Sequence, residues 1–110
     1  MNAAMYAMSF VGVASNGAGA VFIGNGKIIG IDVGNLRYNG TYTEQGGRMK
    51  GTVAMYAPTA GTLVNGVAVP AGSRWNLTLD WPFDFADGKP QLITMDGTPV
   101  QVAFEKIGDV

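Results

Sequence analysis

The chain has 110 residues, enough for one compact domain built around a single hydrophobic core. Hydrophobic residues make up 47% of it, a globular share, whereas charged residues make up only 14% and leave a net charge of −1. This balance gives no electrostatic footprint for a nucleic-acid partner. The sequence contains neither Cys nor His, which excludes disulfides, thiol nucleophiles, Cys/His zinc sites and histidine general bases.

Short runs rich in Val, Ile, Thr, Tyr and Phe alternate with turn dipeptides along the whole chain, and no helical stripe exceeds two turns. The turn pairs, in which Gly and its neighbour tolerate positive φ, are Asn16-Gly17, Asn25-Gly26, Gly46-Gly47, Asn65-Gly66, Asp87-Gly88 and Asp96-Gly97. We predict one domain, residues 1–110, with eight strands and little helix. In chain order the strands are Ala4–Val13, Gly19–Gly24, Lys27–Asp32, Leu36–Thr43, Arg48–Ala57, Ser73–Trp81, Lys89–Thr94 and Thr98–Ile107.

The longest gap between predicted strands is Pro58–Gly72, which contains Leu63-Val64 and Val67-Ala68-Val69 around Asn65-Gly66. It is expected to add a small hairpin or to cover one end of the domain. A second gap, Pro82–Gly88, is interrupted by proline and rich in aromatic residues.

Several predicted strands alternate apolar and polar residues, which is typical of antiparallel sheets with one buried face. Eight such strands leave two exposed edges unless the sheet closes, so the pattern predicts an all-β, eight-stranded, antiparallel up-and-down barrel. Mid-strand glycines, which would permit the coiling that closure requires, are expected at Gly12, Gly30, Gly40 and Gly51. A two-sheet sandwich is the alternative architecture.

The first predicted strand is apolar on both faces. Tyr6 and Phe10 lie on one face, and Met5, Val11 and Val13 lie on the other. Only one face of a barrel strand points inward, and a bare apolar outer face is a liability in solution. The sequence predicts that a homodimer buries it, or that residues 58–72 fold over it.

Two aromatic sets are candidate binding residues. The lumen set, whose side chains are expected to face the barrel interior, comprises Tyr6, Phe10, Tyr38, Tyr42, Trp75 and Phe104. It could hold a small apolar ligand, or it could form a filled core. The surface set for a partner comprises Met5, Val11, Val13, Trp81, Phe83 and Phe85. Its last three members are expected either to anchor a contact with a protein partner or to plug one end of the barrel.

Catalytic and metal-binding patterns are weak. The spacing of Asp80, Asp84 and Asp87 does not provide alternating ligands or the closing Glu of a calcium loop. A carboxylate pair for glycoside hydrolysis could come only from Asp32 and Asp80. Asp32 precedes Val33-Gly34-Asn35 and is expected to hydrogen-bond the turn backbone instead. We therefore predict no enzyme, no metal and no cofactor.

The first charged side chain is Lys27, so no basic segment precedes the apolar run Ala3–Val13, as a secretory signal requires. That run is also too short to span a bilayer. A cytoplasmic protein without a membrane partner is expected.

The first half of the chain, residues 4–57, resembles a bacterial family in the order and spacing of short motifs. These are Tyr6 with Phe10, Gly19-Ala20-Val21 through Ile23, Asn25 through Asp32, Tyr38-Asn39-Gly40-Thr41-Tyr42, and the Gly46-Gly47 hairpin. The chain is similar here to the GrlR-like family, which includes negative regulators of enteric type III secretion.

The resemblance implies a lipocalin-like eight-stranded barrel that is homodimeric and acts by binding a protein partner. In the enteric repressor, alternating Glu and Asp in a hairpin loop recognise the activator; here Thr43-Glu44-Gln45-Gly46-Gly47 holds one acid. Binding of that activator is therefore not implied. The expected function is a protein-binding, non-enzymatic regulator, and the alternative is a carrier of a small hydrophobic ligand in the lumen.

Overall fold

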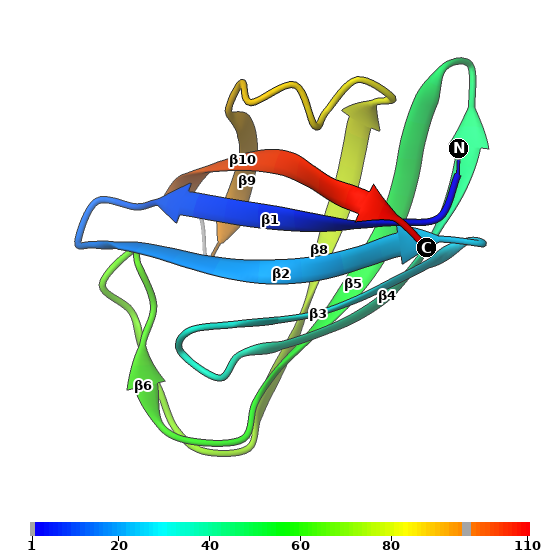
Figure 1. Ribbon diagram of the computed structural model, residues 1–110. Helices are drawn as coiled ribbons and strands as arrows, with labels where there is room; N and C mark the ends of the chain where they lie inside the picture. The colour runs from blue at the N-terminus through cyan, green and yellow to red at the C-terminus, as the bar shows by residue number, and fades with distance from the viewer. Residues whose placement is uncertain (1, 96–97) are drawn as a thin grey trace.

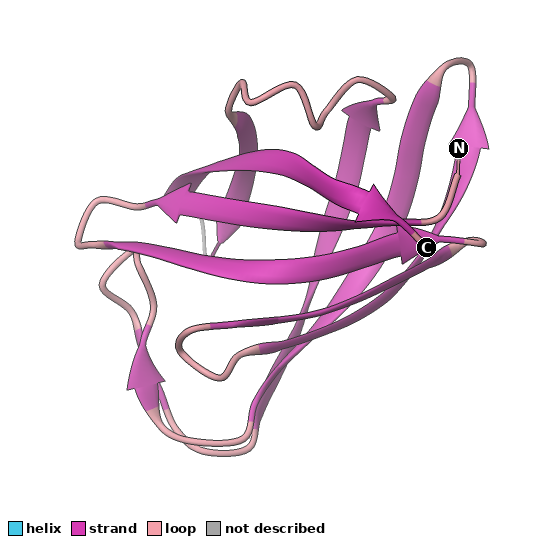
Figure 2. Ribbon diagram, viewed as in Figure 1, coloured by secondary structure: helices cyan, strands magenta, loops and turns pink. Residues whose placement is uncertain are grey.

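The computed structural model describes residues 2–95 and 98–110, and over these residues it contains strands, turns and loops but no helix (Figures 1 and 2). No helix in this part of the chain is thus available to cross a membrane. The strands are β1 Ala4–Val11, β2 Asn16–Gly24, β3 Lys27–Asp32, β4 Arg37–Gln45, β5 Arg48–Ala57, β6 Gly61–Thr62, β7 Ala68–Val69, β8 Ser73–Pro82, β9 Gln91–Met95 and β10 Thr98–Asp109.

Eight of these strands form one antiparallel sheet in the order β8-β5-β4-β3-β2-β1-β10-β9, and β6 and β7 form a separate hairpin. The order follows the chain, apart from the return of β10 to the side of β1. The sheet curls until its two end strands, β8 and β9, approach one another. The predicted up-and-down barrel is confirmed, and the sandwich alternative is wrong.

The barrel is nearly closed rather than fully closed. Within the described residues, β8 and β9 share no ladder of hydrogen bonds, so a seam remains where full closure was expected. The chain between the two edge strands runs through the loop of residues 83–90, and β9 has only five residues. The loop crosses from the end of β8 towards β10, where Asp87 forms an isolated bridge with Glu105 (Figure 1).

Local sequence sets most of the strand boundaries. Asn25 and Gly26 adopt φ of 53° and 76°, and Gly46 and Gly47 adopt 58° and 78°, so the predicted tight turns connect β2 to β3 and β4 to β5. The first predicted strand was too long, because β1 ends at Val11. The predicted Asp96-Gly97 turn lies outside the described residues.

Inward-facing glycines let neighbouring strands coil closely. Gly40 on β4 pairs with Val53 on β5, and a Cβ added to it would lie 2.5 Å from the Thr52 carbonyl oxygen. Gly30 and Gly51 also lie within strands, as expected, whereas Gly12 belongs to the turn that follows β1. A side chain at Gly40 would therefore force β4 and β5 apart.

Segment 58–72 lies at one end of the barrel, where β6 and β7 form the expected small hairpin (Figure 1). The amides of Ala14 and Ser15 donate to the Val64 carbonyl, at 2.8 and 3.1 Å. Val64 is buried, and Leu63 and Val69 pack against the core. We call residues 58–72 the cover.

Candidate functional site

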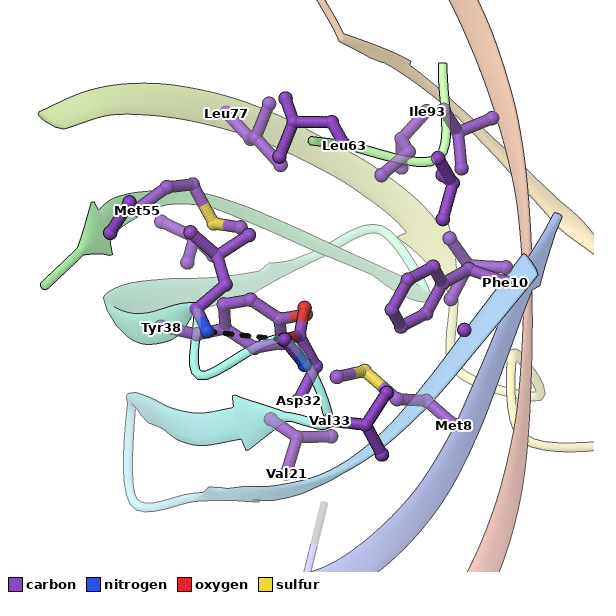
Figure 3. A pocket seen from close by; sticks show the side chains of 18 of the residues that line it. Met8, Phe10, Val21, Asp32, Val33, Tyr38, Met55, Leu63, Leu77 and Ile93 are labelled. Carbon is purple, nitrogen blue, oxygen red and sulfur yellow. Dashed lines mark hydrogen bonds between the residues drawn. The ribbon is translucent and has the colours of Figure 1, made fainter. Parts of the chain in front are cut away.

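The barrel encloses a cavity of about 220 Å³ next to the cover. Its walls come from the inward faces of β1 to β5, β8, β9 and β10. Apolar side chains dominate these walls and include Met8, Phe10, Val21, Met55, Leu63, Leu77 and Ile93 (Figure 3). Since apolar cavities with a few placed polar groups are typical of small-molecule sites, this is the candidate functional site.

Exposed residues from three loops ring the mouth of the cavity. They are Ser15 and Asn16 after β1, Val33 and Gly34 after β3, and Thr59, Gly61 and Thr62 of the cover. The rim is thus mostly small or polar, whereas the interior is apolar.

Aromatic rings close the other end of the barrel. Phe85 from loop 83–90 is fully buried, and its ring centroid lies 5.3 Å from that of Tyr6 and 5.8 Å from that of Trp81. Trp81 and Phe104, whose centroids are 5.0 Å apart, also line the inner end of the cavity. The cavity therefore has an aromatic floor.

One polar pair lies inside the cavity. The Tyr38 hydroxyl donates to Asp32 Oδ2 at 2.6 Å, and Asp32 Oδ1 accepts from the amides of Gly34 and Leu36 at 2.9 and 3.1 Å. Figure 3 shows the two side chains facing each other in the cavity wall. The predicted role of Asp32 in ordering the turn is confirmed.

Burial and the neighbouring carboxylate keep the Tyr38 hydroxyl protonated. Burial raises the pKa of Tyr38, and the hydrogen bond to Asp32 and its negative charge raise that pKa further, so it lies far above the usual range. The Tyr38 phenol thus remains a neutral donor. Asp32 is the one charged side chain among the described residues that line the cavity.

The six predicted lumen residues divide into two groups. Phe10, Tyr38 and Phe104 line the cavity. Tyr6 and Tyr42 are buried in the core instead, and Trp75 is half-buried against it. The inward alternation placed all six on the correct face, but it did not determine how deep along the barrel each one lies.

The predicted surface residues also divide. Val11 and Val13 are 56% and 77% exposed, Phe83 is exposed and Met5 is half-buried. Trp81 and Phe85 are buried, so their placement on a contact surface was wrong. They turn inward because the end of the barrel offers them aromatic neighbours.

One prediction placed residues 58–72, the cover, over the outer face of β1, and this prediction was wrong. The cover packs on the barrel end, and Val11 and Val13 remain exposed. The outer face of the first hairpin is therefore bare within one chain.

The two candidate catalytic carboxylates do not share a cleft. Asp80 lies on the outside of β8, where its Oδ1 accepts from Arg48 Nε at 2.6 Å, and this contact lowers the pKa of Asp80. Asp32 lies in the cavity wall. Within residues 2–95 and 98–110, no group of three or more acidic side chains is placed to hold a metal.

The pairing of Asp32 with Tyr38 was not predicted. Both residues sit on inward positions of adjacent strands, and Gly30 of β3 pairs with Tyr38 of β4. The sequence did carry a signal for this pair. Gly30 has no side chain, which leaves room for the Tyr38 phenol opposite it, and the acidic Asp32 follows two residues later on the same face of the strand.

Comparison with family models, curated proteins and solved structures found no match to this chain.

Proposed function

We propose that the protein is a non-enzymatic binder of a small apolar molecule, which it holds in the lumen of the barrel. The supporting observation is the 220 Å³ apolar cavity between the cover and the aromatic floor. Empty apolar cavities of about 150 Å³ already admit benzene. A cavity somewhat larger than that suits a substituted benzene or a short alkyl chain.

Titration with propylbenzene tests this proposal. We expect saturable binding by calorimetry and a rise in Tm, since a ligand at a hundred times its Kd adds about 2.7 kcal/mol to the free energy of unfolding. Leu77→Trp, which fills the cavity from β8, should abolish binding.

The control for this experiment is Leu92→Trp. Leu92 is exposed on β9 and does not line the cavity, so the same substitution there should leave binding intact. Equal binding by both variants, or none by the unaltered protein, would contradict the proposal.

A second proposal is that the protein binds protein, beginning with a second copy of itself. Its support is the outer face of β1 to β3, where Met5 pairs with Phe22 and Phe22 with Ile29, and Ala20 pairs with Ile31. Ile29 and Ile31 are exposed. The first charged residue in the chain is Lys27, so two such faces related by a two-fold axis could meet without burying a charge from β1 or β2.

Light scattering tests the second proposal. We expect a dimer that Ile31→Lys converts to monomer, because an unpaired charge would be buried at the interface. Leu92→Lys, on the outside of β9, should leave the dimer intact. Particles of only 11.5 kDa for the unaltered protein would contradict it.

The second proposal includes kinship with the GrlR-like family. It therefore also includes a role in regulation through a protein partner. Its support is the antiparallel eight-stranded order of the sheet. The β4–β5 hairpin carries a single acidic residue, Glu44, so we do not extend the proposal to recognition through an acidic loop.

A further inference from the structure

We infer that the cavity selects an apolar molecule bearing one hydrogen-bond donor, a hydroxyl or an ammonium group, and rejects carboxylates. This inference rests on the proposed binding of a small molecule in the lumen and specifies its chemical class. It comes from the Asp32–Tyr38 pair in the cavity wall.

The hydrogen bonds already made by this pair leave it with free acceptor positions and no free donor. A carboxylate offers about four acceptor positions. Three are taken, by the amides of Gly34 and Leu36 and by the Tyr38 hydroxyl. The hydroxyl proton of Tyr38 is committed to Asp32, so its oxygen can only accept another hydrogen bond. A ligand must therefore supply the donor.

The charge at this position gives the second part of the inference. No Lys or Arg lies among the described residues of the cavity wall to offset Asp32. A bound carboxylate would face a like charge, and no cation of the wall stands between the two. An ammonium group would face an opposite charge, and a hydroxyl would donate to a charged acceptor.

The rest of the lining adds little polarity. The other polar side chains, Ser15, Asn16, Thr59 and Thr62, are exposed at the mouth. The deeper walls are apolar down to Trp81 and Phe104. A ligand of the inferred class would direct its donor toward Asp32 and place its apolar part against these walls.

A matched set of ligands tests the inference by calorimetry. The set is 4-propylphenol, 4-propylanisole, 4-propylbenzylamine, 4-propylbenzoate and propylbenzene, which share one apolar frame. The phenol and the anisole both carry the oxygen, but only the phenol has a donor. We expect the phenol and the amine to bind about tenfold or more tightly than the anisole, and the benzoate to bind weakest.

Two substitutions separate recognition from folding. Asp32→Asn keeps an oxygen for the turn amides but removes the charge, and it should abolish the preference for phenol over anisole and relieve the rejection of benzoate. Tyr38→Phe frees Asp32 Oδ2, so the preference should persist or increase. Asp84→Asn, the same change in an exposed loop residue that does not line the cavity, should leave all ratios unaltered.

The ratio of two affinities is the readout, because a purely structural role of Asp32 would weaken all ligands alike. Equal binding of phenol and anisole, strong binding of benzoate, or an undiminished preference in Asp32→Asn would overturn the inference. If propylbenzene binds while these patterns fail, the lumen proposal survives alone. If no member of the set binds, both are wrong.

Discussion

The rings of Phe85 and Phe104 meet edge to face, with centroids 5.3 Å apart and planes at 88°. Phe85 comes from an irregular loop, whereas Phe104 comes from the middle of β10. Their contact, with Tyr6 and Trp81 around it, fills one end of the barrel. Packing of a loop side chain thus helps to seal a barrel whose backbone seam remains open.

The burial of Phe85 predicts that alanine substitutions at Phe85 and at the nearby Phe83 lower the free energy of unfolding by different amounts. Phe85→Ala should lower the free energy of unfolding by about 3–5 kcal/mol, because it removes a fully buried ring. Phe83→Ala, at a side chain that is 41% exposed, should change it by about 0.5 kcal/mol or less. Urea unfolding measures both. If Phe85→Ala does not fold, Phe85→Leu provides a milder loss, and equal effects at the two positions would refute the plug.

Ionisation of Tyr38 predicts a loss of stability at high pH. The unfolded phenol ionises near pH 10, about its ordinary pKa, whereas the folded pKa is raised. The stabilising contribution is therefore complete below about pH 10 and is lost as pH rises further, by about 1.4 kcal/mol per pH unit. Burial also raises the pKa of Tyr6, which adds to the same trend.

The variant Tyr38→Phe isolates this contribution. It should be less stable than the unaltered protein near neutral pH, by about 1–2 kcal/mol for the lost hydrogen bond. Above about pH 10 its stability should fall less steeply, since one raised pKa is gone. Urea unfolding from pH 8 to about pH 12 measures both slopes, and parallel curves would count against the burial of the phenol.

The close approach of β4 and β5 predicts that Gly40→Ala is destabilising. The added Cβ would lie 2.5 Å from the Thr52 carbonyl oxygen and 2.8 Å from the Val53 Cα. Overpacking of this kind costs about 1–3 kcal/mol. Gly108→Ala on β10, where an added Cβ meets nothing within 4 Å, is the control and should be close to neutral. A similar Tm for both variants would show that the strands can separate freely.

Periodicity and turn chemistry fixed the strand content from the sequence alone. Dipeptides such as Asn25-Gly26 require positive φ, and alternation with period two assigns each side chain to one face, so both are local properties. The barrel followed because eight alternating strands need to cover their edges. The position of Asp32 in its turn was predictable for the same local reason.

Contacts between distant segments were decided only in the tertiary structure. Whether Phe85 turned outward or into the barrel depended on space between Tyr6, Trp81 and Phe104, which lie on three different strands. The seam between β8 and β9, the seating of the cover beneath the β1–β2 turn, and the meeting of Tyr38 with Asp32 likewise depend on how the sheet curls. Local sequence sets the face on which a side chain lies, but the volume left inside the nearly closed barrel sets what that side chain touches.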